Sequence, residues 1–217
     1  MSLAAIDTLM VKDAVADARR TLARESLALN ARNAAGRNLP PLILTTDDQR
    51  DGDYIEAVRA LPAGSALIVR HRDPAKLERL AVTLCDIARP LGVRCLIAGD
   101  LHLAERLDAD GIHASEANLS CIKQWRAHHA RWLITGAIHN PAAAAQAEGA
   151  SALLLSPVFA TASHPGTLAL GVDAFEAMAQ RIPMPVYALG GVTASNVAQL
   201  AGTHAAGVAL IGGWLRS

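Results

Sequence analysis

The chain has 217 residues, a length that suits one large domain, and 52% of them are apolar while only 3% are aromatic. Its 20 basic residues balance its 20 acidic ones, so no charged field indicates a nucleic acid or a strongly charged partner. No segment has the length and apolar character of a membrane span or a signal peptide. We therefore expect a cytoplasmic protein with no membrane partner.

The three cysteines, Cys85, Cys95 and Cys121, form no CxxC pair and are widely spaced. An odd count with this spacing argues against a disulfide framework and against a zinc site. We expect buried thiols, as in a protein of a reducing compartment.

The first segment with a clear pattern is residues 4–33, which lack Gly and Pro and carry Leu, Val and Ala at helical spacing. This pattern predicts one or two helices that end near Gly36. Residues 1–38 are therefore predicted to form an N-terminal helical extension that packs on the main domain, residues 39–217.

From Pro41 onward, short apolar runs alternate with helical segments. The predicted strands are 41–46, 66–72, 94–100, 111–115, 132–139, 151–159, 185–191 and 207–214. The predicted helices between them are 54–61, 73–90, 101–109, 120–130, 140–149, 172–182 and 193–200. Strict alternation predicts parallel strands with right-handed crossovers. Eight units favour a (β/α)₈ TIM barrel over an open doubly wound sheet, and no GxGxxG follows the first strand.

The last predicted strand ends close to Ser217, so this barrel is expected to lack its last helix. In a closed barrel, the eighth strand lies beside the first, and that seam would then be uncovered. We expect the N-terminal extension to cover it.

Pairs of glycines lie at the ends of the last two predicted strands, at Gly190–Gly191 and Gly212–Gly213. Backbone N–H groups left bare by glycine near a helix start can hold a phosphate, and barrels commonly bind phosphate after strands seven and eight. The alternative is two tight turns in which only glycine fits.

Cationic and imidazole groups are expected at the same end of the barrel. Arg70 and Arg72 alternate on one side of the second strand and could clamp an anion. His139 ends the fifth strand, where a neutral imidazole could move protons near pH 7, and His113 ends the fourth. A structural role is the alternative for each histidine. Asp100 is the main acidic candidate, so no two-carboxylate magnesium site is evident.

Four segments, taken together and in order, resemble the thiamin phosphate synthase / TenI family of (β/α)₈ barrels over about residues 41–214. They are DADGIHASEANL (108–119), GAIHN (136–140), ASALLLSPVFATASHPG (150–166) and PVYALGGVTASN (185–196). The resemblance implies a thiazole phosphate site and a pyrophosphate loop. Its implied binding residues are Gly190, Gly191, Ile211 and Gly212 for the phosphate, and Thr161, Ser163 and His164 for the loop. It also implies that His139 acts as the acid/base, as in the thiazole tautomerases.

The departures from the synthase pattern decide the preferred function. The third strand ends in AGD where synthases have NDR, so only Asp100 could bind magnesium, and the second magnesium aspartate falls on Asn118. The family's serine falls on Ala137 and its loop lysine on His164. These losses favour a TenI-like thiazole tautomerase that needs no cofactor.

Two alternatives stay open. The first is a divergent thiamin phosphate synthase (thiamin-phosphate pyrophosphorylase), which joins pyrimidine pyrophosphate to thiazole phosphate and would use Mg²⁺. The second is a non-catalytic, regulatory barrel that only binds a phosphate ligand. In each case the expected ligand is a small phosphate compound, thiazole phosphate or thiamin phosphate, and the chain could form a homodimer.

Overall fold

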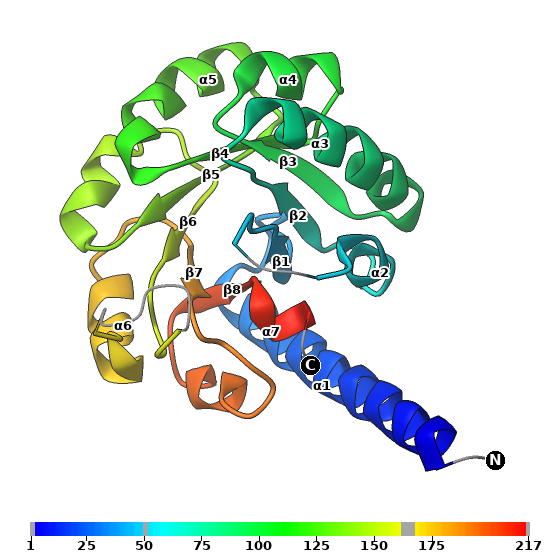
Figure 1. The fold of residues 1–217 in the computed structure, drawn as a ribbon. Coiled ribbons are helices and arrows are strands. Elements are labelled where there is room, and N and C mark those ends of the chain that lie inside the picture. Colours follow the sequence, from blue (N-terminus) through cyan, green and yellow to red (C-terminus); the bar gives the residue numbers. More distant parts are fainter. Residues whose placement is uncertain (1–2, 50–51, 162–167, 216–217) are drawn as a thin grey trace.

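Eight parallel strands close into a barrel in chain order, within the part of the chain that this computed structural model describes, residues 3–49, 52–161 and 168–215 (Figure 1). The strands are β1 (Leu42–Thr45), β2 (Ala66–Val69), β3 (Arg94–Ala98), β4 (Gly111–Ala114), β5 (Leu133–Ile138), β6 (Ala152–Leu155), β7 (Val186–Leu189) and β8 (Ala205–Leu210). β1 pairs with both β2 and β8, which closes the ring. The (β/α)₈ barrel predicted from the sequence is confirmed.

Helical segments follow the strands on the outside of the barrel (Figure 1). The α-helices are α1 (Leu3–Asn33), α2 (Tyr54–Arg59), α3 (Pro74–Ala88), α4 (Leu101–Arg106), α5 (Ile122–His128), α6 (Gly171–Ala179) and α7 (Gly212–Leu215). The 3₁₀ segments are η1 (Arg89–Leu91), η2 (Glu116–Cys121), η3 (Pro141–Gln146) and η4 (Val197–Leu200). No helix in the described ranges is long and apolar enough to cross a bilayer.

Three predicted elements differ from the observed ones. The segments after β5 and β7 are 3₁₀ turns, η3 and η4, and not α-helices. The last predicted strand ends early, at Leu210, and the chain then forms the short helix α7. In α7, the Trp214 side chain is buried at 1% exposure, and its indole N–H donates to the Ala57 carbonyl at 2.9 Å.

Alternating side chains along each strand divide the core into two layers. In β6, Leu153 and Leu155 pack in the outer layer against the helices, whereas Leu154 lies in the inner layer with Ile43 and Tyr187. Parallel strands covered on both faces are apolar at most positions, not at alternate ones. This is the reason that the strands appear in the sequence as continuous apolar runs.

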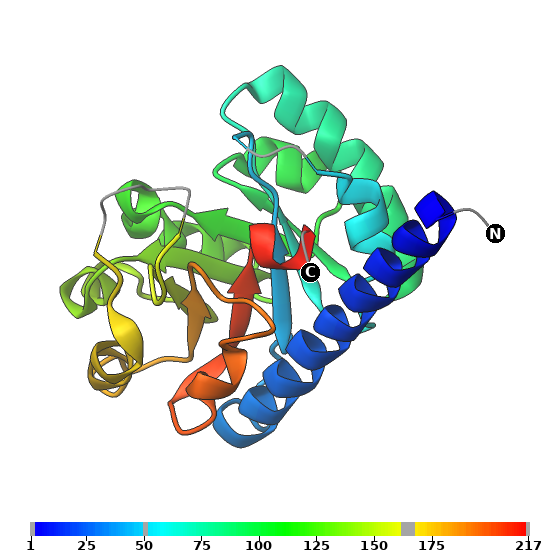
Figure 2. The ribbon, with the colours of Figure 1, turned by 60° about the horizontal axis from the view of Figure 1, so that its bottom comes forward.

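Helix α1 packs along β8 and also contacts β1 (Figure 2). Leu22 and Leu29 of α1 are buried. The Asn30 side-chain amide donates to the Ala206 carbonyl at 2.9 Å, and that of Asn33 donates to the Ala205 carbonyl at 2.7 Å. These contacts lie at the seam between β8 and β1. The division of the chain at residue 38 stays a prediction.

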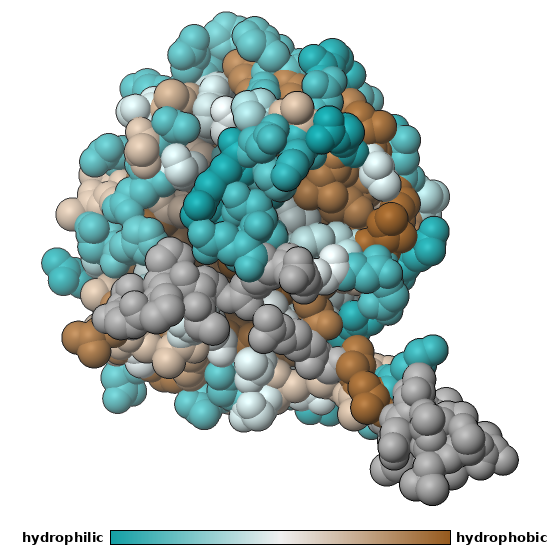
Figure 3. All heavy atoms as spheres, viewed as in Figure 1, coloured by the Kyte–Doolittle hydropathy of each residue, from teal (hydrophilic) through white to brown (hydrophobic). Residues whose placement is uncertain are grey.

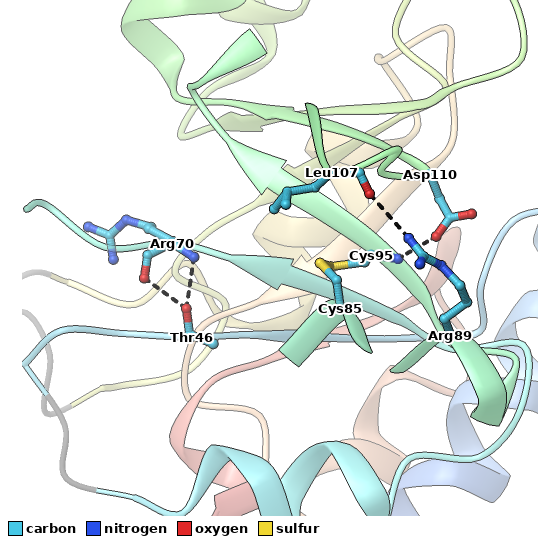
Figure 4. The surroundings of a disulfide bond; sticks show 7 residues. All are labelled: Thr46, Arg70, Cys85, Arg89, Cys95, Leu107 and Asp110. Carbon is cyan, nitrogen blue, oxygen red and sulfur yellow. Dashed lines mark hydrogen bonds between the residues drawn. A yellow bond between two sulfur atoms is a disulfide. The ribbon is translucent and has the colours of Figure 1, made fainter. Parts of the chain in front are cut away.

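A disulfide bond corrects the prediction of free thiols. Cys85 of α3 and Cys95 of β3 are bonded, with their Cα atoms 5.6 Å apart, and Cys121 remains free (Figure 4). The prediction was wrong because the chain reverses between the two residues, so that the end of α3 packs directly against β3. A separation of 10 residues along the chain therefore becomes a direct contact in the fold.

Candidate functional site

A cavity of about 350 Å³ opens at the carboxyl ends of the strands. Its lining residues are Asp47, Gln49, Arg70, Arg72, His139, Ser156, Pro157, Thr161, Leu189, Gly190 and Ile211. Hydrophilic side chains gather over the centre of the face that carries α7 (Figure 3). The fold thus brings together six predicted site residues that come from five different parts of the sequence: Arg70, Arg72, His139, Thr161, Gly190 and Ile211.

Two arginines form the basic side of the cavity. The Arg70 guanidinium lies 3.6 Å from the Asp47 carboxylate, and Arg72 lies 3.6 Å from Asp48. The Thr46 hydroxyl fixes the backbone of Arg70, because it donates to the Arg70 carbonyl and accepts from the Arg70 N–H, both at 2.8 Å (Figure 4). The arginine side chains remain 40% and 65% exposed, so a ligand in the cavity can reach them.

The two aspartates were not predicted as site residues, although they directly follow β1. Both carboxylates are nearly buried. Burial raises the pKa of Asp48, but Arg72, backbone N–H groups and Arg70 together outweigh that effect and hold this pKa below its usual value. One Asp48 carboxylate oxygen, Oδ1, is buried and has no hydrogen-bond partner among the described residues. Asp100 was expected to be the main acidic residue at this end, whereas Asp47 lines the cavity and Asp100 does not.

His139 follows β5 and lies between a backbone carbonyl and a carboxylate. Its Nδ1 is 2.9 Å from the Ser156 carbonyl and 3.3 Å from the Ser156 hydroxyl, and its Nε2 is 3.6 Å from Glu116. Because a carbonyl oxygen only accepts, the geometry assigns the Nδ1 proton to this bond. Nε2 is then the ring nitrogen that can accept or return a proton, and it faces the Glu116 carboxylate.

The segment after β6 packs directly against the backbone of the two glycines that follow β7. Gly190 and Gly191 have φ of +95° and +67°. A Cβ on Gly190 would lie 2.8 Å from the Pro157 Cα, and one on Gly191 would lie 2.4 Å from the Ala160 carbonyl oxygen. The tight-turn reading therefore explains why glycine is needed. Gly190 and Ile211 also line the cavity, whereas Gly191 and Gly212 do not; a phosphate cradle stays a prediction.

His113 lies inside the barrel and does not line the cavity. It is 8% exposed, and its Nδ1 is 2.9 Å from the Thr135 hydroxyl. Burial, with a smaller contribution from Arg70, lowers the pKa of His113 to about 4. The side chain is therefore neutral near pH 7.

The residues fit a magnesium site poorly. Asp100 caps α4, since its carboxylate accepts from the Leu103 N–H at 2.9 Å, and it does not line the cavity. Asp47 and Asp48 each lie beside an arginine, which repels a cation. No group of three metal-binding side chains occurs within the described ranges. Ser163 and His164, which the resemblance assigns to the pyrophosphate loop, lie outside the described residues.

Fold and cavity together define a (β/α)₈ barrel with a pocket lined by two arginines and a histidine at its carboxyl end. A sequence profile of the family described as "Thiamine monophosphate synthase" matches residues 42–213. The thiamine-phosphate synthase of Methanoculleus marisnigri is 32% identical over 78% of this chain and 85% of its own length. That of Chloroflexus aurantiacus is 30% identical over 75% and 78%. The chain belongs to the thiamine monophosphate synthase family.

Solved structures agree on the fold. The thiamine phosphate pyrophosphorylase of Pyrococcus furiosus superposes with a TM-score of 0.68 at 20% identity, covering 83% of this chain and 89% of that one. The curated relatives named above are synthases, which are transferases. The prediction of an enzyme of this family is confirmed. Within it, the comparisons favour the synthase alternative over the TenI-like tautomerase that the departures from the motif had favoured.

Sequence reasoning did not name Asp47, Gln49 or Ser156 as binding residues, or Glu116 as a neighbour of His139. A signal existed for the first three, because they directly follow β1 or β6 and strand ends are where barrel sites form. Nothing in the sequence places Glu116 beside His139, since the two residues come from different units of the barrel.

Proposed function

We propose that the chain is a thiamine-phosphate synthase that joins pyrimidine pyrophosphate to thiazole phosphate in this cavity. The observation that supports this most is that two sets of residues predicted to hold anions line one cavity. Arg70 and Arg72 form one, and the backbone at Gly190 and Ile211 forms the other. A reaction with a pyrophosphate on one substrate and a phosphate on the second needs both groups, whereas a tautomerase needs only one.

In this proposal, each group of the cavity has a defined role. Arg70 and Arg72 hold the pyrophosphate and stabilise the charge it gains as the carbon–oxygen bond to the pyrimidine methylene breaks. The thiazole phosphate is held near Gly190 and Ile211, which directs the ring nitrogen to form the new carbon–nitrogen bond. Protonated His139 donates a hydrogen bond to the departing pyrophosphate. No step is assigned to a metal ion, because the carboxylates present do not fit one.

The test is the formation of thiamin phosphate from the two substrates, read as thiochrome fluorescence, with Mg²⁺ and with EDTA. We expect turnover in wild type. Arg70→Met should lower kcat/KM roughly 10- to 100-fold, because this is the loss expected when one charged hydrogen bond to an anion is removed. Arg106→Met is the matched control, because Arg106 pairs with Glu78 on the outside of the barrel. Folded wild-type protein that binds both substrates and forms no product would contradict the proposal.

A thiazole tautomerase is the second candidate, and the arrangement of His139, Ser156 and Glu116 favours it. Proton transfer on the ring needs an acid/base and a phosphate anchor but no metal. Exchange of the ring proton of thiazole phosphate, followed by NMR, would separate this function from the first. His139→Ala should abolish exchange and keep binding. Binding with neither reaction would leave the regulatory barrel. A cytoplasmic location and a homodimer stay predictions.

A further inference from the structure

We propose that Arg19 of the N-terminal helix is a positioning residue of the cavity, and that it acts by holding α7 in place. The proposal deepens the proposed function, because α7 begins directly after Ile211, a lining residue near which the phosphate is expected to bind. Arg19 does not itself line the cavity. Its effect on a ligand therefore has to pass through α7.

Arg19 joins three helices. Its guanidinium forms a two-pronged ion pair with Glu56 of α2, at 2.7 and 2.8 Å. Its Nε donates to the carbonyl of Trp214 in α7 at 3.1 Å, and the guanidinium carbon lies 5.5 Å from the centre of the Trp214 ring. The side chain is only 11% exposed. The hydrogen bond from Arg19 holds the pKa of Glu56 below its usual value.

Helix α7 depends on such contacts because it is short. A helix of four residues cannot be stable through its own hydrogen bonds, and its last carbonyls have no partner within the helix. Arg19 satisfies one of them, and a cation at a helix C-terminus is favourable in addition. The second tie is the bond from the Trp214 indole to Ala57 of α2. The two hydrogen bonds thus attach α7 to α1 and to α2, and α7 lies beside α1 in the fold (Figures 1 and 2).

The position of α7 sets the position of the backbone that precedes it. A Cβ on Gly213 would lie 2.2 Å from the Val192 carbonyl oxygen, so α7 also rests against the segment after β7. Without Arg19, the Trp214 carbonyl and Glu56 would both lose their partner. The N–H groups at Ile211 and Gly212 would then be less well aligned toward an anion, whereas His139, which follows β5 and has no contact with Arg19 or Trp214 among those described, would not move.

The experiment compares Arg19→Met with Arg20→Met. Arg20 is the neighbouring residue on the same helix, and its side chain is 69% exposed and pairs only with Asp17 within the described residues. The first measurement is amide hydrogen exchange at residues 211–215 by NMR. We expect exchange there to become at least about tenfold faster in Arg19→Met and to stay unchanged in Arg20→Met. Unchanged exchange in Arg19→Met would overturn the proposal.

The second measurement is function. The Kd for inorganic phosphate and the KM for thiazole phosphate should each rise roughly tenfold in Arg19→Met, while kcat stays within about twofold. A fall in kcat with unchanged KM would overturn a positioning role through the phosphate end. If Arg19→Met does not fold, Glu56→Gln, which weakens the ion pair and keeps the shape, should show the same changes at smaller size.

The two proposals fail in different ways. A wild-type protein that makes no thiamin phosphate contradicts the synthase function, but the exchange rates at α7 still test Arg19. Normal turnover in wild type with normal KM in Arg19→Met contradicts the role of Arg19 alone.

Discussion

The β1–β2 end and the β3–β4 end of this barrel are built from the same kind of unit, yet only one of them contributes to the cavity. After β1 and β2, Asp47, Arg70 and Arg72 turn their side chains into it. After β3 and β4, none of the described residues lines it, although Asp100 and His113 were both predicted to do so. The resemblance places the magnesium carboxylates of the synthases at this second end.

The difference shows that a position at a strand end does not by itself determine whether a polar side chain lines the cavity. Arg70 continues the inward alternation of Ile68 and reaches the cavity. Asp100 instead meets the bare N–H groups at the start of α4 and caps them. His113 also points inward, but it lies deep enough to bond with Thr135. Among the described residues, the basic side chains therefore line the cavity at the β1–β2 end, and Asp100 at the β3–β4 end does not.

The largest expected effect separates two glycines with nearly the same backbone conformation. Gly191 after β7 has φ +67° and no room for a Cβ, whereas Gly99 after β3 has φ +73° and nothing within 4 Å. Gly191→Ala should lower the free energy of unfolding by about 4 kcal/mol, from strain plus overpacking. Gly99→Ala should cost about 1 kcal/mol, from strain alone. Urea unfolding of both variants measures this, and equal losses would show that the cavity side is no more tightly packed.

The next effect concerns His113 and pH. Its pKa is about 4 in the fold against 6.5 for an ordinary histidine, so the unfolded chain takes up this proton first as pH falls. The stability from this group is complete above about pH 6.5 and is lost as pH falls toward 4, by at most about 3 kcal/mol. His113→Gln should flatten that part of the curve of unfolding free energy against pH. His102→Gln, on an exposed side chain, should not.

The fold could be predicted because its cause lies in local patterns. Eight apolar runs and the helical segments between them specify parallel strands buried on both faces. The exact ends of the strands could not be predicted, because they depend on contacts between units. Strand β2 ends at Val69, and the next residue, Arg70, forms its backbone hydrogen bonds with the Thr46 hydroxyl of the preceding unit. That partner is 24 residues away in the sequence.

The site was predicted in part for the same reason. Residues that follow a strand, such as His139 and Arg72, were found from position alone. The Cys85–Cys95 bond and the contact between His139 and Glu116 depend on packing between separate elements, which no spacing rule contains. The preference for a tautomerase followed from lost metal ligands, and it gave too little weight to the two arginines, which a synthase can use for its pyrophosphate.

The smallest expected effect tests the β3–β4 end directly, through Asp100. Its carboxylate caps α4, so Asp100→Ala should lower the free energy of unfolding by about 1 kcal/mol, and Asp100→Asn should keep the cap and most of the stability. Neither change should alter the dependence of turnover on Mg²⁺, measured across a magnesium titration. Loss of magnesium-dependent turnover in Asp100→Asn, at normal stability, would mean that this carboxylate leaves its cap to bind the ion. The β3–β4 end would then bind the magnesium ion, as the resemblance to the synthases implies. The arginines would remain at the β1–β2 end of the same barrel.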